Sequence, residues 1–300
     1  MNSMYTSFKE IETALLGKAP KRLALAAAND EVFIASVIKA AKRGLVDPIL
    51  IGNTSIMKSL LTQMQENVAD YTLIDCADES DAVNKACEMA KNGDADVIMK
   101  GLMQTATFMK AILNRDAYGF LSDKSLLSQA TILEFDGRLL ILTDCAVNIS
   151  PNYNDKVKII NNAARLANKL GISYPKVAVI APVEVVNPQI GATIDAAMLS
   201  KASQRGQIKS CIVDGPFGLD NALSKEAAEH KGIISNVAGQ PDILLLPDLC
   251  TGNVLTKALV YFAKGLESCG TLLGTSIPVV MTSRTDTAQN KYYAILMSLL

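Results

Sequence analysis

The stretch RLALAAANDEVFIASVIKAA, residues 22–41, decides the fold. It begins as a short apolar run of strand length, which ends at the polar pair Asn29 and Asp30. Directly after this pair, apolar residues recur every three positions from Val32 to Ala41, which places one apolar stripe along a helix that the pair caps. Strand, cap and amphipathic helix are the repeating unit of parallel sheets covered by helices, so the stretch predicts an α/β protein.

The same alternation continues on both sides of one interruption. Strand candidates before it are Arg22–Ala28, Pro48–Gly52, Tyr71–Asp75 and Ala95–Lys100, and candidates after it are Lys176–Ala181, Ile208–Val213, Asp242–Pro247 and Ile277–Thr282. The interruption is the pair Asp136-Gly137 between two apolar runs, which favours a tight hairpin turn. Helices such as Asp155–Leu170 separate the later strands. We therefore expect two α/β domains, the first formed by residues 1–129 and 284–300 and the second by 130–283.

Composition excludes several classes of protein. Hydrophobic residues make up 49% of the 300 positions, which is enough for sizeable cores. The 29 Lys and Arg residues nearly cancel the 30 Asp and Glu residues, so the chain has no basic excess with which to bind nucleic acid. Apolar runs fall far short of the roughly 18 residues that a spanning helix needs. We expect neither nucleic acid nor a membrane as a partner.

Cysteine and histidine usage limits the location and the metal chemistry. The start, MNSMYTSFKEIETALLGKAPKR, shows no export signal, and the six cysteines have no CxxC spacing. A reducing cytoplasm is therefore the expected location. The chain has a single histidine, His230, which excludes HExxH zinc sites and sites built from several histidines. No metal site is expected, and neither a GxGxxG nor a P-loop fingerprint indicates a bound nucleotide.

Polar residues follow almost every predicted strand, where parallel sheets bind ligands. They are Asn29, Lys100 with Gly101, Asp144 and Asn148, Glu184 with Asn187, Asp214 with Gly215, Asp248 with Gly252 and Asn253, and Ser283 with Arg284. For any one of them, helix capping or turn formation is an alternative. Ser283 and Arg284 stand just before a predicted helix, Thr287–Leu300, where they predict an anion site.

Acid–base work falls to carboxylates, because His230 lies on a charged helical stretch. The candidates are Asp144, Asp214, Asp248 and Asp286. Cys145 is the one cysteine whose position after a strand suggests a site. No neighbouring histidine could activate its thiol, so we interpret Cys145 as a buried small apolar residue.

Several long segments in order resemble the phosphate acetyltransferase and phosphate butyryltransferase family. They are DVIMKGLMQTATFMKAIL (96–113), LLILTDCAVNISP (139–151), PKVAVIAPVEVVNPQIGATIDA (175–196), IVDGPFGLDNAL (212–223), DILLLPDLCTGNVLTKALVYFA (242–263) and PVVMTSRTDTAQNKYY (278–293). The resemblance implies a fold similar to the isocitrate and isopropylmalate dehydrogenases, with two α/β domains and an active site in the cleft between them. It also implies a homodimer or a larger homo-oligomer.

The implied reaction transfers an acyl group between coenzyme A and inorganic phosphate, with both as substrates and with no metal or redox cofactor. The compact length resembles the butyryl branch, so butyryl-CoA is the expected acyl donor. Acetyl-CoA is the alternative donor. A second alternative is a non-catalytic protein that senses acyl-CoA, and a third is a metal-dependent dehydrogenase of the same broad fold.

The resemblance also assigns roles to candidate residues. It implies that Arg284 holds the phosphate and that Ser283 donates to the carbonyl oxygen of the acyl group. In the substrate-binding segments, Asp144 and Asn148 match TDxAxN, Gly252 and Asn253 match a PDxxxGN turn, and Lys100 with Gly101 match a KG motif. We expect Gly252 to let the backbone approach a ligand.

Two positions depart from the family pattern. Acetyltransferases carry an aspartate, proposed to take the CoA thiol proton, at the position of Asn290. An amide cannot act as this base, so Asp286, water or the phosphate itself would accept the proton, and Asp286 is favoured. The family often has a histidine where this chain has Gln129, which puts a catalytic role for that segment in doubt.

Overall fold

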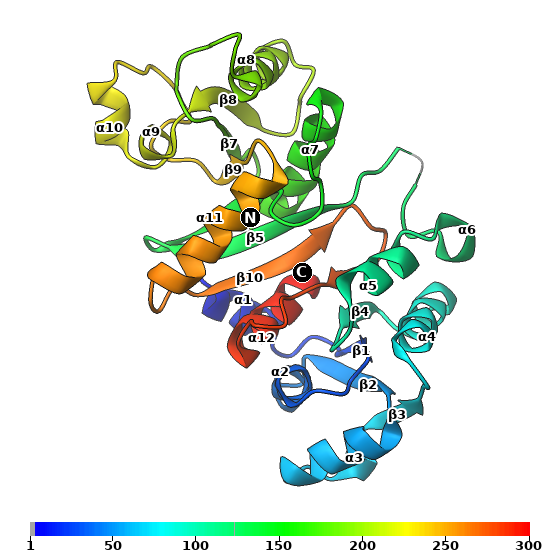
Figure 1. The fold of residues 1–300 in the computed structure, drawn as a ribbon. Coiled ribbons are helices and arrows are strands. Elements are labelled where there is room, and N and C mark those ends of the chain that lie inside the picture. Colours follow the sequence, from blue (N-terminus) through cyan, green and yellow to red (C-terminus); the bar gives the residue numbers. More distant parts are fainter. Residues whose placement is uncertain (1–3, 123) are drawn as a thin grey trace. The chain divides into compact units, whose positions relative to one another are not determined.

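The computed structural model describes residues 4–122 and 124–300, which form two compact units (Figure 1). Unit 1 contains residues 4–7 and 126–268, and unit 2 contains the other described residues, up to 125 and from 269 onward. Residues 269–283 thus lie in unit 2, although we expected them in the domain formed by 130–283. The reason is that strand β11 (Val279–Val280) pairs in parallel with β4 (Val97–Lys100). Residues 4–7 and 126–129 lie in unit 1, although we expected them in the domain formed by 1–129 and 284–300. Residues 1–3 and 123 of the expected first domain lie outside the described residues.

Unit 2 contains strands in the order β3-β2-β1-β4-β11-β10. Besides β4 and β11 they are β1 (Lys21–Ala26), β2 (Val46–Gly52), β3 (Thr72–Asp75) and β10 (Ser268–Leu273). All are parallel to their neighbours except β10, which is antiparallel to β11. The carboxyl ends of β1, β4 and β11 therefore share one edge of this part of the sheet, the place where parallel sheets bind ligands.

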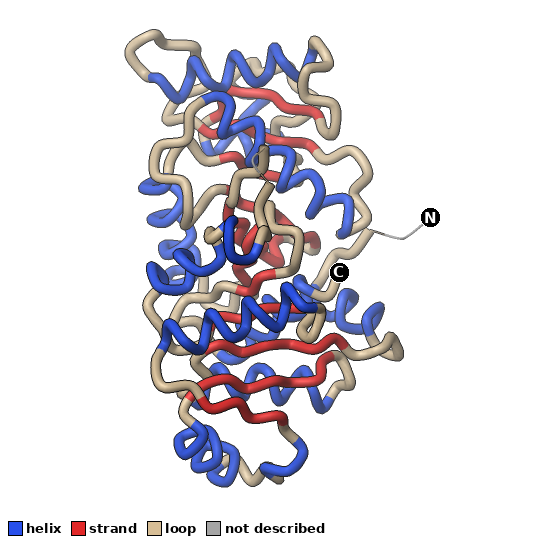
Figure 2. The backbone as a smooth tube through the Cα atoms, turned by 90° about the vertical axis from the view of Figure 1, so that its right-hand side faces the viewer, coloured by secondary structure: helices blue, strands red, loops and turns tan. Residues whose placement is uncertain are grey.

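Helices cover both faces of the strands of unit 2 (Figure 2). They are α1 (Phe8–Leu15), α2 (Glu31–Lys42), α3 (Thr54–Gln63), the 3-10 helix η1 (Val68–Asp70), α4 (Glu79–Asn92), α5 (Thr105–Ile112), α6 (Arg115–Tyr118) and α12 (Ala288–Ser298). Helix α12 packs between α1 and α2, whereas α4 packs against β1, β4 and α5. The predicted cap is confirmed, because the Asp30 carboxylate accepts hydrogen bonds from the N–H groups of Val32 and Phe33 at the start of α2.

Unit 1 contains strands in the order β5-β6-β9-β7-β8. They are β5 (Ser128–Phe135), β6 (Arg138–Thr143), β7 (Lys176–Ile180), β8 (Ile212–Phe217) and β9 (Ile243–Leu245). Strands β5 and β6 form the predicted hairpin, and both turn residues have positive φ, 50° at Asp136 and 68° at Gly137. This conformation matches the twist of two antiparallel strands, which explains why an Asp-Gly pair stands there.

The helices of unit 1 are α7 (Tyr153–Lys169), α8 (Gly191–Gln204), α9 (Leu219–Leu223), α10 (Lys225–His230) and α11 (Leu249–Phe262). Alternate strand residues such as Leu140, Leu142 and Leu244 enter one core, which is closed by residues of α9, α10 and α11. Helices α7 and α8 pack against each other and against the strands. Among the described residues, no helix is both long and apolar enough to cross a bilayer.

Strands β9 and β11 are shorter than the predicted Asp242–Pro247 and Ile277–Thr282, and two further strands depart more strongly from the prediction. Strand β8 covers Ile212–Phe217 rather than Ile208–Val213, and it includes the pair Gly215-Pro216. This pair reads as a strand breaker, yet β8 is the last strand in its order, where a proline without an N–H group is tolerated. Strand β10, which contains Gly270, was not predicted for a similar reason: glycine in a short apolar segment indicates a turn.

Candidate active site

The Ser283–Arg284 pair lies on a turn between β11 and α12. The Asp286 carboxylate closes this turn, because it accepts a hydrogen bond of 2.7 Å from the N–H group of Ser283. From the first turn of α12, the Lys291 ammonium donates to the carbonyl oxygens of Ser283 at 2.8 Å and of Asp286 at 2.6 Å. Backbone and side chains thus fix the turn at the sheet edge where β4 and β11 end.

Lys291 is a functional residue that the sequence analysis missed. Its side chain is 0% exposed, and its ammonium lies 4.4 Å from the centre of the Phe33 ring on α2. Burial lowers the pKa of Lys291, while the charges of Asp286 and Asp30 oppose this shift. The sequence signal for this role is a single lysine at the start of the otherwise uncharged stretch KYYAILM, all of which is buried in α12. Lys291 therefore acts as an internal support of the Ser283–Arg284 turn.

We expect Lys291→Met to lower the free energy of unfolding by about 2–4 kcal/mol, because the hydrogen bonds from a buried ammonium to two carbonyl oxygens are lost. Lys39 is the matched control, since its ammonium also lies 4.4 Å from a ring centre, that of Tyr292, but its side chain is exposed. Lys39→Met should change stability by less than about 1 kcal/mol. Urea unfolding of both variants measures the difference, and equal effects would contradict the assigned support role.

The side chains of Ser283 and Arg284 themselves are exposed. The Ser283 hydroxyl is 3.0 Å from the hydroxyl of Thr285, and Arg284 donates to the side-chain oxygen of Gln104 at 3.3 Å. Gln104 precedes α5, and its N–H group donates to the Glu79 carboxylate at 2.8 Å. The turn after β11 is thereby joined to the segment that follows β4, as expected if both segments contribute to one site.

Lys100, the last residue of β4, is 1% exposed. Its ammonium makes one long hydrogen bond of 3.4 Å, to the carbonyl oxygen of Gly101. Burial lowers its pKa to about 8, and the charges of Arg284 and Lys291 lower it further, against the effect of Glu79. Three cationic side chains thus lie near one another, and Lys100 is the least well paired of them.

The glycine at position 101 is explained by the lack of space for a side chain there. A Cβ atom at this position would lie 2.5 Å from the carbonyl oxygen of Ala26 and 2.8 Å from the carbonyl carbon of Ala27, so any side chain would displace backbone. The N–H group of Gly101 donates to Ala26 at 2.8 Å. Glycine therefore lets the exits of β4 and β1 pack against each other, and this close approach is what places Lys100 at the sheet edge.

The depressed pKa of Lys100 predicts a pH dependence of stability. Because the folded state holds this amine with a pKa of about 8, below the ordinary lysine value of 10.5, the unfolded state binds more protons between these two values. The free energy of unfolding should consequently rise with pH across this window and show no Lys100 contribution to the slope below it. Urea unfolding from pH 7.5 to 10.5, compared with Lys100→Met, measures this slope; equal slopes in both proteins would contradict it.

In unit 1, Asp144 follows β6 and is 2% exposed. Its carboxylate accepts hydrogen bonds from the N–H groups of Ala146 at 2.9 Å, Val147 at 3.0 Å and Asn148 at 3.2 Å, and from the Asn148 side chain. The Asn148 amide also donates to the carbonyl oxygen of Leu127 at 2.9 Å. Asp144 and Asn148 thus hold the shape of the loop after β6, and the Asp144 oxygens are occupied by backbone donors.

Gly252 and Asn253 lie in the first turn of α11, so the expected PDxxxGN turn is helical here. The structure brings protein backbone to Gly252: a Cβ atom there would lie 2.9 Å from the Cα atom of Cys145 and still closer to the carbonyl oxygen of Asp144. Gly252 therefore allows α11 to pack closely against the loop after β6, and Asn253 is the next residue along the helix.

Cys145 is confirmed as a buried apolar residue, with 2% of its surface exposed. Burial and the neighbouring Asp144 charge raise the pKa of its thiol to about 12, which disfavours the thiolate that a nucleophile requires. Gln129, at the family's histidine position, donates to the carbonyl oxygen of Ala130 at 2.9 Å and to the Thr131 hydroxyl at 3.1 Å. Its side-chain oxygen is buried and has no partner among the described residues.

The other carboxylate candidates hold local structure. Asp248 caps α11 and accepts from the Thr251 N–H group at 2.8 Å, while Asp214 accepts from the Ser200 hydroxyl at 2.9 Å. Asp286 caps the Ser283 turn, as described above. Asn290 donates its N–H group to the Thr287 hydroxyl at 3.1 Å within the first turn of α12. Each of these residues therefore has a role in local structure.

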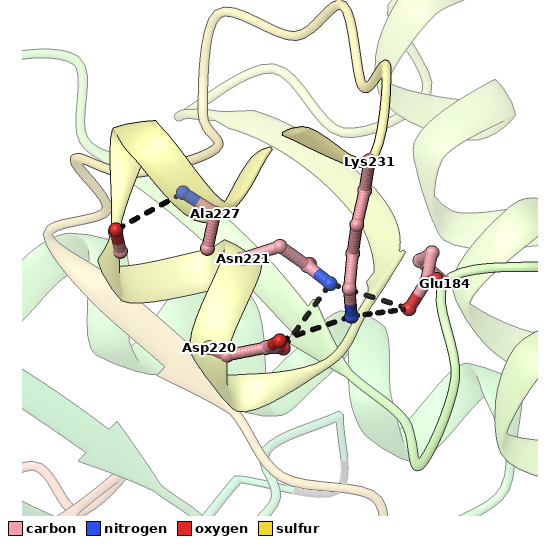
Figure 3. Close-up of polar contacts among 6 residues, drawn as sticks. Glu184, Asp220, Asn221, Ala227 and Lys231 are labelled. Atoms are coloured by element: carbon pink, nitrogen blue, oxygen red, sulfur yellow. Dashed lines mark hydrogen bonds and ion pairs between the residues drawn. The ribbon is translucent and has the colours of Figure 1, made fainter. Parts of the chain in front are cut away.

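Glu184 belongs to an ion-pair network at the ends of β7 and β8 (Figure 3). The Lys231 ammonium lies 3.1 Å from Glu184 and 3.0 Å from Asp220, and the Asn221 amide donates to both carboxylates at 3.3 Å. The hydrogen bonds from Lys231, together with its charge, lower the pKa of Glu184 and of Asp220. This network ties the loop after β7 to α9 and to the segment after α10, so the polar character of Glu184 has a structural explanation.

Comparison with known proteins identifies the family. The sequence profile described as phosphate acetyl/butaryl transferase matches residues 64–299. The chain belongs to this family. A phosphate butyryltransferase of Clostridium acetobutylicum is 44% identical over 300 residues, covering 99% of this chain and 98% of that protein. A phosphate acetyltransferase of Thermotoga maritima is 43% identical over 280 residues, covering 93% of this chain and 94% of that protein.

Solved structures agree with this membership of the phosphate acetyl/butaryl transferase family. A branched-chain phosphotransacylase from Enterococcus faecalis superposes with a TM-score of 0.79 at 30% identity, covering 93% of this chain and 97% of that chain. A 4-hydroxythreonine-4-phosphate dehydrogenase from Burkholderia phymatum shares the fold, with a TM-score of 0.53 at 13% identity and coverage of 94% and 98%. The resemblance and the dehydrogenase-like fold expected from the sequence are both confirmed.

Proposed function

We propose that the protein transfers an acyl group between coenzyme A and inorganic phosphate, as acyl-CoA + phosphate giving acyl phosphate + CoA. The observation that carries this proposal is the braced Ser283–Arg284 turn beside Lys100, in a chain of this family. An exposed guanidinium next to a second cation suits a doubly charged phosphate, which Arg284 can hold by charge-assisted hydrogen bonds. Ser283 then donates to the acyl carbonyl oxygen as negative charge develops on it.

The remaining site residues belong to the same proposal. Lys100 with Gly101 would complete the phosphate side of the site in unit 2. The loop that Asp144 and Asn148 shape, and the start of α11 at Gly252 and Asn253, would contribute the substrate-binding surface of unit 1. Asp286 positions Ser283 by accepting a hydrogen bond from its backbone N–H group, and it is the carboxylate next to the reacting pair. The N–H group of Asn290 donates to the Thr287 hydroxyl, which caps α12.

Transfer is proposed to be direct, in a complex that holds both substrates. A phosphate oxygen attacks the thioester carbonyl carbon, a tetrahedral oxyanion forms, and the C–S bond breaks with both electrons passing to sulfur. A covalent acyl-enzyme is disfavoured because the Cys145 thiol is buried and hard to ionise.

Cys145→Ala should therefore keep turnover within about threefold of the wild type, whereas loss of an oxyanion donor costs about 100-fold or more. Pre-steady-state mixing with acyl-CoA in the absence of phosphate should show no burst of free thiol. A burst that Cys145→Ala abolishes would replace direct attack by an acyl-enzyme route.

Butyryl-CoA is the proposed acyl donor. Two additional methylenes are worth roughly 1.5 kcal/mol of burial, or about tenfold in specificity relative to acetyl-CoA. The test is release of free thiol from acetyl-, propionyl-, butyryl- and valeryl-CoA, with and without phosphate, on protein treated with chelator. Phosphate-dependent release that peaks at four carbons supports the proposal, and a peak at two carbons assigns acetyl-CoA instead. CoA binding without turnover of any substrate would indicate the sensing alternative.

We also propose that the enzyme needs no metal or redox cofactor and works in the cytoplasm as a homodimer or larger homo-oligomer. All six cysteines are free thiols, which suits a reducing compartment. Helix α11 exposes Val254, Tyr261 and Phe262, with 62%, 69% and 86% of their surfaces accessible, and such an apolar helix surface suits contact between subunits. Activity measured after chelation tests the statement that no metal is needed, and activity lost with the metal would favour the dehydrogenase alternative. Light scattering of the protein eluted from a sizing column tests the oligomeric state.

A further inference from the structure

Lys100 is a buried lysine without a carboxylate at ion-pair distance among the described side chains. Compare Lys156, which is also buried but lies 2.5 Å from the Asp195 carboxylate. Lys291, equally buried, donates to two carbonyl oxygens. Within the described part of the chain, Lys100 has only its long bond of 3.4 Å to the carbonyl oxygen of Gly101. An ammonium held this way lacks the partners that normally make burial of a charge tolerable.

The groups that face Lys100 come from several elements. Arg284 on the turn after β11 and Lys291 on α12 are cations, and the Glu79 carboxylate at the start of α4 counteracts their effect on Lys100. Gln104 connects two of these groups, because its side chain accepts from Arg284 while its N–H group donates to Glu79. Lys100 therefore lies within the same cluster as the proposed phosphate ligand Arg284, at the end of β4 rather than on the surface.

Resting on the proposed function, we propose that Lys100 is the proton-transfer residue of the reaction. When acyl phosphate forms, the Lys100 ammonium gives a proton to the CoA sulfur as the C–S bond breaks and sulfur takes the bonding electrons. The neutral amine regains a proton from the P–OH group of the product, which leaves acyl phosphate as a dianion. In the reverse direction, the neutral amine takes the CoA thiol proton and the thiolate attacks the carbonyl carbon of the acyl phosphate. The C–O bond to phosphate breaks with both electrons passing to oxygen, and the Lys100 ammonium returns its proton to the released phosphate.

This role fits the chemistry of the partners. A free thiol has a pKa of about 8.5, and proton transfer is most effective when donor and acceptor are closely matched near the working pH. Burial brings the pKa of Lys100 to about 8, close to that of a thiol. The role also supplies a proton acceptor for the reaction. Asn290 cannot accept a proton, and the Asp286 carboxylate already accepts a hydrogen bond from the Ser283 N–H group. A lysine can then do the work that the family's aspartate does elsewhere.

The test compares Lys100→Ala and Lys100→Arg with Lys110→Ala, an exposed lysine on α5. Lys100→Ala should lower kcat about 100- to 10,000-fold in both directions. Lys100→Arg keeps a positive charge but cannot release a proton, so its KM for phosphate should stay within a few-fold while kcat remains low. Lys110→Ala should behave as the wild type. The rise of kcat with pH in the CoA plus acyl phosphate direction should be lost in Lys100→Arg.

Chemical rescue separates proton transfer from a purely electrostatic or structural role. Small primary amines such as ethylamine should restore turnover to Lys100→Ala, with an effect that varies with the pKa of the amine, and should not restore Arg284→Ala. Wild-type kcat in Lys100→Arg would overturn the inference, as would a Lys100→Ala protein that retains turnover within threefold. If Lys100→Ala fails to fold by circular dichroism, the kcat and pH profile of Lys100→Arg decide. Absence of turnover in the wild type would overturn the proposed function itself.

Discussion

Arg284→Ala and Ser283→Ala should each lower turnover of acyl-CoA with phosphate by about 100- to 1,000-fold, because each removes a charged or polar donor from the reacting groups. The two substitutions should differ in KM. Arg284 is expected to hold phosphate in the ground state as well as in the transition state, so its loss should also raise the KM for phosphate. Ser283 is proposed to donate to a charge that exists mainly in the transition state, so its loss should lower kcat and leave KM nearly unchanged.

Steady-state kinetics with varied phosphate measures both effects. Thr285→Ala is the matched control, since Thr285 lies on the same exposed turn and its hydroxyl is 3.0 Å from that of Ser283. It should keep turnover within about tenfold of the wild type. If Arg284→Ala and Ser283→Ala both retained more than a tenth of the wild-type turnover, the Ser283–Arg284 turn would not be the reacting site.

Gly252→Ala should lower the free energy of unfolding. A helical glycine exchanged for alanine ordinarily gains about 1 kcal/mol. Here the new Cβ atom would lie 2.9 Å from the Cα atom of Cys145, and the atoms it meets are backbone that cannot rotate away. Overpacking should outweigh the helix preference and cost about 1–3 kcal/mol or more. The displaced loop carries Asp144, so the KM values for the substrates should also rise.

Gly191→Ala provides the control within the same unit. Gly191 is likewise in the first turn of a helix, α8, and a Cβ atom there would meet nothing within 4 Å. This substitution should be neutral or stabilising by up to about 1 kcal/mol. Thermal and urea unfolding of the two variants compare the same chemical change in a closed and in an open position. Equal stability of the two variants would show that α11 does not need glycine for its seat.

The sequence predicted those features that depend on local pattern. The strand, cap and helix at 22–41 and the Asp136-Gly137 hairpin are both present, because apolar period and turn chemistry act over a few residues. Strand β8 was shifted, since nothing local shows that Gly215-Pro216 lies at an edge. The site residues Ser283, Arg284 and Lys100 were chosen from their positions after strands, and the structure places these three near one another within unit 2.

Contacts between distant parts of the chain could not be predicted from the sequence. Lys291 reads as a polar residue in an apolar helix, and only the fold shows that it donates to Ser283 and Asp286. The exclusion of a side chain at Gly252 depends on the backbone of Asp144, which lies far away in the sequence. The same holds for the pKa of Lys100, because burial and neighbouring charges set it after folding is complete.

The pairing of β4 with β11 has a consequence for the order of synthesis. Residues 97–100 leave the ribosome long before residues 279–280, and residues 126–268 of unit 1 are made in between. One edge of β4 therefore stays without its partner strand while these residues of unit 1 emerge, and an unpaired edge is a template for aggregation. Lys100 at the end of that strand remains without Arg284 until translation is nearly finished. The nascent chain is thus most exposed to misassembly in this interval, and chaperone capture should be strongest there.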